Sequence, residues 1–207
     1  MKKHWNFSYF FSKIQNKYLS KKLGESPWLP YNCVLFLKQY LKKTDVFLET
    51  GSGNSTIWFS KLVQKIISIE HNSEWFNLVT KRIAKSGKDN IEYYLESNEF
   101  TDNTNNVPYV KRVASFPDAS FDVILVDGKH RSQIAHLALK KIRKPGLIVI
   151  DNAERYLVID SKLPEGIRNI SQMTPDWKEF SEITQQYRKV VFSDGISSSI
   201  LFFIHAD

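Results

Sequence analysis

Short, continuous apolar runs alternate with amphipathic segments along most of the chain, and this alternation restricts the fold more than any other feature. Such runs are typical of strands buried on both faces, as in a parallel sheet covered by helices. The pattern therefore predicts an α/β protein built on one doubly wound, mostly parallel sheet. The expected strands are residues 46–48, 66–69, 91–95, 121–126 and 147–150, and the expected helices are residues 56–63, 72–85 and 132–143.

The two ends of the chain depart from this alternation. Apolar residues after Pro30 recur at helical spacing, so we expect residues 1–44 to be a lead-in of N-terminal helices and residues 45–207 to be the α/β domain. Near the other end, two apolar runs flank Asp194-Gly195, which is a turn signal. We expect a terminal antiparallel hairpin there, added to the parallel sheet.

Composition and charge exclude several classes of protein. The hydrophobic fraction of 42% is ordinary for a globular protein, no apolar run is long enough to span a bilayer, and no signal peptide is recognised. The single Cys33 rules out an internal disulfide and is expected to be a buried, inert thiol, so we expect a cytoplasmic protein. The net charge of +7 comes from lysine pairs spread along the chain, which does not favour a nucleic-acid surface and suits an acidic small molecule equally well. The sequence leaves the oligomeric state open.

The junction between the first expected strand and the helix after it is the most informative segment. It reads Glu49-Thr50-Gly51-Ser52-Gly53-Asn54-Ser55, and neither glycine carries a Cβ that would keep a ligand away from the backbone. In a doubly wound sheet, ligands bind at the carboxyl ends of strands, near the point where the strand order reverses. The segment predicts a cofactor-binding loop, although a tight turn that binds nothing would use the same glycines.

Two carboxylates narrow the choice of ligand. Glu70 ends the second expected strand about 20 residues after Glu49, which is the interval at which an acidic side chain accepts hydrogen bonds from ribose hydroxyls. Glu49 directly precedes the loop, where it suits a ligand with a cationic end and would repel a pyrophosphate. A dinucleotide motif also requires glycine where this chain has Thr56. Together these residues favour adenosine joined to a positively charged group over NAD.

The segment from Glu49 to Ser55 resembles motif I of the class I, Rossmann-like methyltransferases, with serine in place of the usual last glycine. Residues 67–71 resemble their second motif, residues 116–128 their fourth strand with its lead-in, and residues 144–151 their fifth strand. The resemblance covers residues 28–205. It implies a Rossmann-like fold and a methyltransferase that uses S-adenosylmethionine.

The resemblance also implies roles for individual residues. The loop would hold the methionine part of the cofactor, Glu70 the ribose, and Glu96 or Ser97 would lie near the adenine. His71 follows Glu70 directly and is expected to border the cofactor. The expected cofactor-binding residues are Glu49, Gly51, Ser52, Gly53, Ser55, Glu70, His71, Glu96, Ser97 and Asp127.

The segment after the fourth expected strand bears on the methyl acceptor. Methyltransferases that act on nitrogen in nucleic-acid bases and some protein amides typically carry Asn/Asp-Pro-Pro-Tyr/Phe there. This chain reads Val126-Asp127-Gly128-Lys129-His130-Arg131 instead. The difference disfavours base methylation and agrees better with an oxygen nucleophile on a small molecule.

A second resemblance raises the question of a metal. Asp127 and the pair Asp151-Asn152 are similar to the ligands of the metal-dependent catechol and caffeoyl-CoA type O-methyltransferases, where three oxygen ligands suit Mg²⁺. Those enzymes have a second acid after strand four, whereas this chain has Lys129-His130-Arg131, whose positive charge would lie where the cation sits. Mg²⁺ is therefore not the favoured cofactor, and we assign no metal ligands. Asp127 would then fix the cofactor loop, and Asp151 would cap the turn after it.

The candidate catalytic residues are His130, as a general base because imidazole titrates near neutral pH, and Asp127. Aromatic residues in the segment 28–31 and at Tyr109, together with the turn 194–199, would either cover the substrate or belong to the core. Two rival functions remain: a nicotinamide-dependent oxidoreductase, which Glu49 and Thr56 disfavour, and an adenosine-binding module without catalysis.

Overall fold

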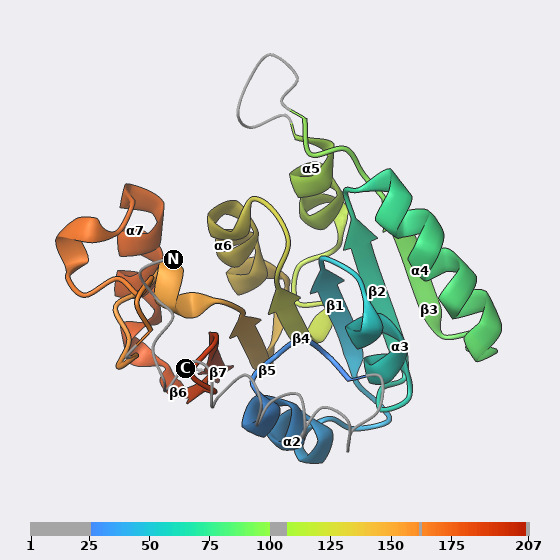
Figure 1. Ribbon diagram of the computed structural model, residues 1–207, viewed down its shortest axis with the longest axis horizontal. Coiled ribbons are helices and arrows are strands. Elements are labelled where there is room, and N and C mark those ends of the chain that lie inside the picture. Colours follow the sequence, from blue (N-terminus) through green and yellow to red (C-terminus); the bar gives the residue numbers. More distant parts are fainter. Residues whose placement is uncertain (1–25, 100–106, 162, 206–207) are drawn as a thin grey trace, which may run out of the picture.

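The computed structural model describes residues 26–99, 107–161 and 163–205. Within these residues, seven strands form one sheet in the order β3-β2-β1-β4-β5-β7-β6 (Figure 1). The first five strands are parallel, and β6 and β7 add the antiparallel hairpin. The strands are β1 (Val46–Thr50), β2 (Lys65–Glu70), β3 (Ile91–Leu95), β4 (Phe121–Val126), β5 (Ile142–Ile150), β6 (Arg188–Ser193) and β7 (Ser198–Ile204). The predicted Rossmann-like fold with its terminal hairpin is confirmed.

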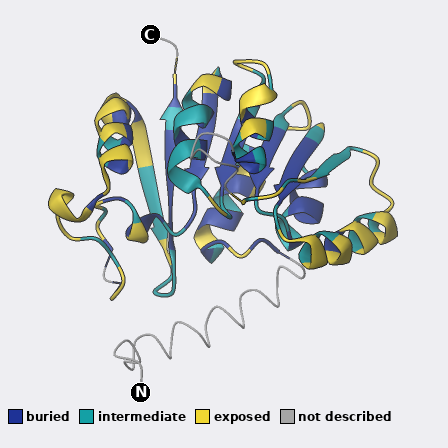
Figure 2. Ribbon diagram, turned by 90° about the horizontal axis from the view of Figure 1, so that it is seen from above, coloured by how far each residue is buried: buried dark blue, intermediate teal, exposed yellow. Residues whose placement is uncertain are grey.

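Helices cover both faces of this sheet, so its central strands are buried between two layers, whereas the edge strands β3 and β6 are partly exposed (Figure 2). Helices α2 and α3 pack on one face, and α5, α6 and α7 pack on the other. The helices are α2 (Tyr31–Tyr40), α3 (Asn54–Ser60), α4 (Ser73–Ser86), α5 (Pro108–Ser115), α6 (Arg131–Lys141) and α7 (Pro175–Ile183), with short 3-10 turns η1 (Ala153–Arg155), η2 (Ile170–Gln172) and η3 (Thr184–Gln186). Among the described residues, none of these helices is both long and apolar enough to cross a bilayer.

The core on the α2 face is built from apolar side chains of β1, α2 and α3, among others. Phe47 of β1 stacks on Phe59 of α3 with ring centroids 4.5 Å apart, and both are fully buried. Cys33 of α2 lies in the same core, as predicted, and burial raises the pKa of its thiol to about 12. Helix α2 is the described part of the expected lead-in, because residues 1–25 lie outside the described residues. The boundary expected before residue 45 stays a prediction.

Two local details differ from the expectations. Helix α6 ends at Lys141, two residues earlier than predicted, because Ile142 already pairs with Phe121 in the sheet. The register between β4 and β5 shifts after this pair, around Pro145, whose nitrogen has no hydrogen to donate to a ladder. Helix α5 was not predicted, since it follows directly on a polar stretch. The sequence reads as a polar loop at residues 97–106, of which residues 100–106 lie outside the described residues.

The strand order reverses between β1 and β4, and this arrangement positions the site. Strand β1 pairs with β2 on one side and β4 on the other, so the carboxyl ends of all three lie at one edge of the sheet (Figure 1). Thr50 joins the ends of β1 and β4, because its hydroxyl donates to the Asp127 carbonyl at 3.0 Å and its carbonyl accepts from the Asp127 amide at 3.1 Å. The loops after β1 and β4 therefore start side by side.

Candidate functional site

The two glycines of the loop after β1 have different surroundings. Gly51 has a φ of +86°, and a Cβ there would lie 2.9 Å from the Gly128 backbone nitrogen, so the two loops meet only because both residues are glycine. Gly53 is extended, and a Cβ there would meet nothing closer than 3.9 Å, from Ser55 and Trp75. Packing against the Gly128 loop therefore requires glycine at position 51. No such packing requires glycine at position 53, where the space beside the backbone is free for a ligand.

Glu49 lies fully buried beneath this loop. Its Oε2 accepts hydrogen bonds from the Thr56 hydroxyl at 2.6 Å and the Ser68 hydroxyl at 2.8 Å. Its Oε1 has no hydrogen-bond partner among the described residues. Burial raises the pKa of Glu49 to about 7, and the hydroxyls of Ser55, Thr56 and Ser68 offset part of that effect. The carboxylate thus has an oxygen available for a further donor.

Ser68 was not singled out from the sequence, although a signal existed. It is the polar residue within the otherwise apolar segment 66–69 of β2, and it is fully buried. Its hydroxyl therefore needs a hydrogen-bond partner within the protein.

Glu70 is held by the loops on both sides of it. Its Oε2 accepts from the Ser52 amide at 3.1 Å and the Ser52 hydroxyl at 2.8 Å, and its Oε1 accepts from the amides of His71 and Asn72 at 2.8 Å each. The Ser52 hydroxyl also shares a 2.6 Å hydrogen bond with the Tyr93 hydroxyl. Glu70 therefore anchors the glycine loop to the end of β2, a role that the sequence did not indicate.

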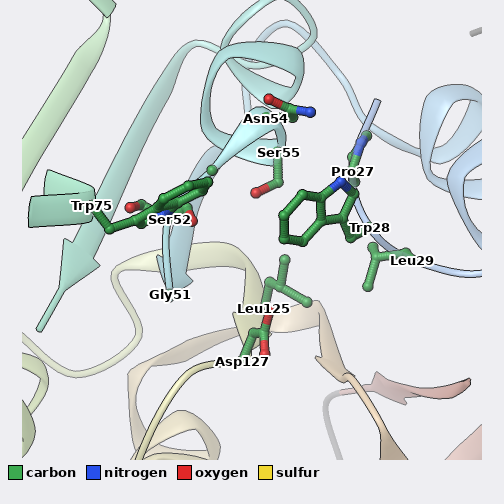
Figure 3. Close-up of a pocket in the computed structure, with 11 residues that line it drawn as sticks. Pro27, Trp28, Leu29, Gly51, Ser52, Asn54, Ser55, Trp75, Leu125 and Asp127 are labelled. Carbon is green, nitrogen blue, oxygen red and sulfur yellow. Dashed lines mark hydrogen bonds between the residues drawn. The ribbon is translucent and has the colours of Figure 1, made fainter. Parts of the chain in front are cut away.

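Two adjoining clefts open above this loop, and they share Trp28, Gly51, Ser52, Trp75 and Asp127 as lining residues. The first extends over residues 53–55, and the second extends toward Glu70 and His71 at the end of β2. Figure 3 shows the two tryptophan rings on opposite sides of Ser55. Of the residues expected to hold the methionine part and the ribose, Gly51, Ser52, Gly53, Ser55, Glu70 and His71 thus line one continuous region, and Glu49 is buried beneath the loop.

The two tryptophans are held differently. Trp75 donates a 2.8 Å hydrogen bond from Nε1 to the Ser52 carbonyl, whereas Trp28 is 80% exposed, with its ring centroid 6.1 Å from that of Trp75. Trp28 belongs to the segment 28–31, whose aromatic residues were expected either to cover the substrate or to lie in the core. Tyr109, considered for the same role, is instead fully buried in the core, with its ring beside His71.

Arg131 joins the ends of β4 and β5. Its guanidinium donates to the Asp151 carbonyl at 2.5 Å, to Asn152 Oδ1 at 3.1 Å and to Asp127 Oδ1. Its Nε donates to the Gly128 carbonyl at 3.1 Å. The guanidinium therefore lies among the oxygens of the three residues that resemble metal ligands.

This donor set does not fit a divalent cation. The oxygens that Asp127 and Asn152 would offer already accept hydrogen bonds from a fixed positive charge. The Asp151 carboxylate points elsewhere and accepts from the Ser199 hydroxyl at 2.8 Å. Burial, together with the charge of Asp127, raises the pKa of Asp151 above its ordinary value. Across the described ranges, no group of three or more His, Cys, Asp or Glu side chains is arranged to hold a metal.

Four expected site residues line neither cleft: Glu49, which is buried beneath the loop, and His130, Glu96 and Ser97. His130 has a left-handed backbone conformation at the start of α6, and its Nε2 lies 3.3 Å from the Asn98 carbonyl. Glu96 is paired with Arg112, at 2.6 Å from its Nε and Nη2. The Ser97 hydroxyl accepts from the Glu99 amide at 3.1 Å. The described residues that line the two clefts do not include His130, Glu96 or Ser97. The roles expected for these three residues therefore stay predictions.

Comparison with known proteins gives a family and a fold. A family model described as a methyltransferase domain matches residues 48–153, whereas no curated protein sequence matches significantly. A putative caffeoyl-CoA O-methyltransferase from Staphylococcus aureus superposes with a TM-score of 0.59 at 15% identity, over 97% of this chain and 94% of that one.

Two further solved structures are similar to the same extent. The O-methyltransferase TomG from Streptomyces achromogenes, involved in tomaymycin synthesis and solved in complex with S-adenosylmethionine, has a TM-score of 0.59 at 15% identity, over 97% and 91% of the two chains. A putative O-methyltransferase from Klebsiella pneumoniae gives 0.58 at 15% identity, over 96% and 87%. At this level of identity, the likeness establishes a shared fold.

Proposed function

Starting from the fact that the chain belongs to the class I, S-adenosylmethionine-dependent methyltransferases, we propose that it transfers a methyl group to an oxygen atom of a small molecule. The observation that carries the cofactor assignment is Glu49 Oε1, which has no hydrogen-bond partner within the described part of the chain and is buried beneath a glycine loop at the switch point of the sheet. A buried carboxylate with a spare acceptor suits a ligand with an ammonium group. The amino-acid end of S-adenosylmethionine carries that group.

The cofactor would lie along the two clefts. Its methionine part would occupy the first cleft over the loop at residues 51–55, with its ammonium group reaching Glu49 directly or through one water. Its ribose would lie in the second cleft, where Glu70 and His71 are found. The space left open at Gly53 supports this placement, because a backbone without a Cβ lets a ligand approach closely.

Methyl transfer depends more on the alignment of the acceptor with the methyl group than on covalent catalysis by the protein. Bound S-adenosylmethionine supplies a methyl group that its sulfonium already activates. Asp127 is the carboxylate that both clefts share, and its side chain is 38% exposed. We assign to it the task of holding the acceptor hydroxyl and receiving its proton, and to Trp28 the task of covering the acceptor. No step is assigned to a metal ion.

Two observations support an oxygen acceptor. The segment Val126–Arg131 lacks the Asn/Asp-Pro-Pro-Tyr/Phe sequence typical of base-methylating enzymes. The three solved structures described above are all named as O-methyltransferases. A small molecule is favoured because Trp28 and Trp75 line both clefts, with their rings on opposite sides of Ser55.

The experiment that tests the proposal is methyl transfer from S-adenosylmethionine labelled in its methyl group. Parallel reactions would contain phenols and catechols, hydroxy acids, primary amines, oligonucleotides and a mixture of proteins, all in EDTA. We expect label in the hydroxyl-bearing small molecules. Label in oligonucleotides or amines alone would contradict the proposed acceptor class while leaving the enzyme class unchanged.

A further inference from the structure

Four of the five N–H groups of Arg131 are used on four oxygens from two neighbouring strand ends. Asp127 and Gly128 follow β4, and Asp151 and Asn152 follow β5. The side chain is only 11% exposed, and its guanidinium lies 5.6 Å from the centroid of the Tyr156 ring. Arg131 is therefore a fixed part of this edge of the sheet rather than a mobile surface charge.

The oxygens around Arg131 make a set that a hard cation would also accept. They comprise one carboxylate oxygen, one side-chain amide oxygen and two backbone carbonyl oxygens. Of the two carboxylates in this region, Asp127 accepts directly from the guanidinium, whereas the Asp151 carboxylate accepts from the Ser199 hydroxyl and offers Arg131 only its backbone carbonyl.

We propose that the Arg131 guanidinium is a built-in cation that takes the place of a divalent metal ion between the ends of β4 and β5. It fixes Asp127, which lines both clefts, so Arg131 is a positioning residue that acts through Asp127. The inference rests on the proposed function only in placing the acceptor beside Asp127. It has a consequence independent of catalysis: removal of the guanidinium should convert the same oxygens into a divalent-cation site.

The test uses Mn²⁺ as the probe, because its binding can be followed by electron paramagnetic resonance without turnover. The proteins are freed of metal with EDTA, dialysed and titrated with Mn²⁺. We expect no saturable Mn²⁺ site in the wild type and one saturable site in Arg131→Gln. That site should bind Mn²⁺ at least tenfold more tightly than the residual binding of the wild type. Arg131→Lys keeps a positive charge and should gain no site. Arg131→Gln combined with Asn152→Ala should lose the gained site.

Each outcome decides the matter. A saturable Mn²⁺ site in the wild type that Asn152→Ala removes would overturn the inference, and so would a folded Arg131→Gln variant that binds no Mn²⁺. If Arg131→Gln does not fold by itself, recovery of cooperative unfolding with Mn²⁺ supports the inference, and failure to recover overturns it. Binding of S-adenosylhomocysteine to the wild type tests the proposed function separately. This measurement does not depend on whether a cation can bind in place of Arg131.

Discussion

Replacing Glu49 with glutamine should change the pH dependence of stability by an amount that follows from the burial of this side chain. Burial raises its pKa from 4.5 to about 7 in the folded protein. Between these values the folded state holds a proton that the unfolded state has released, so stability falls as the pH rises through this window and stays lower above it. At about 1.4 kcal/mol per pKa unit, the difference amounts to about 3 kcal/mol.

Glutamine resembles the protonated form of Glu49, because its amide oxygen can still accept from Thr56 and Ser68. The free energy of unfolding of Glu49→Gln, measured relative to the wild type, should therefore rise by about 3 kcal/mol from pH 4.5 to pH 8. Urea unfolding at several pH values, without cofactor, measures this difference. Two stability curves that stay parallel across the window would refute the assigned ionisation of Glu49.

The cofactor adds a second measurement on the same variant. An ammonium group near Glu49 favours the charged carboxylate, so binding of S-adenosylmethionine below pH 7 should release a proton. Calorimetric titrations in buffers of different ionisation enthalpy count the released protons. Glu49→Gln has no proton to lose at this position and should show no such release. Equal proton release by the two proteins would place the ammonium group elsewhere.

Three further substitutions test other parts of the site. Gly51→Ala should lower the melting temperature more than the control Gly87→Ala, because both residues have positive φ but only the first would push a Cβ against the Gly128 backbone; equal losses would mean that the two loops separate freely. Glu70→Gln should weaken S-adenosylhomocysteine binding by about 1.5–3 kcal/mol in calorimetry, since the amide cannot accept all the bonds that the carboxylate accepts; unchanged affinity in a folded variant would falsify its role. His130→Ala separates the two candidate bases: with Asp127 as the proton acceptor, kcat should stay near the wild-type value, whereas a loss of about 10²–10⁴-fold with cofactor affinity unchanged would assign the proton to His130 instead.

The parts of the fold that were predictable depend on residues near in sequence. The apolar runs at β1, β2 and β4 fix the parallel sheet, because strands without alternation must be covered on both faces. The placement of Glu49 and Glu70 at strand ends likewise depends on local pattern alone. The turn at Asp194-Gly195 and its flanking apolar runs were enough to predict the hairpin.

The parts that escaped prediction depend on contacts between distant segments. The positive charge of Arg131 was visible, but its bonds to Asp151 and Asn152 exist only because β4 and β5 are neighbours in the sheet. The bond between Ser52 and Tyr93 joins the loop after β1 to strand β3, across β2, in the same way. Periodicity could not place the end of α6 either, because sheet pairing at Ile142 overrides the local helical pattern.

The most direct test of where S-adenosylmethionine binds is its calorimetric titration into Gly53→Ala. An added Cβ at this position contacts no protein atom closer than 3.9 Å, so the variant should fold and melt like the wild type. We predict that its affinity for S-adenosylmethionine falls at least about tenfold, equivalent to about 1.4 kcal/mol, because the methyl group occupies the space through which the ligand meets the loop. Gly87→Ala, at the far end of α4, should leave the affinity unchanged. Wild-type affinity in a folded Gly53→Ala variant would contradict the assignment of this loop to the cofactor.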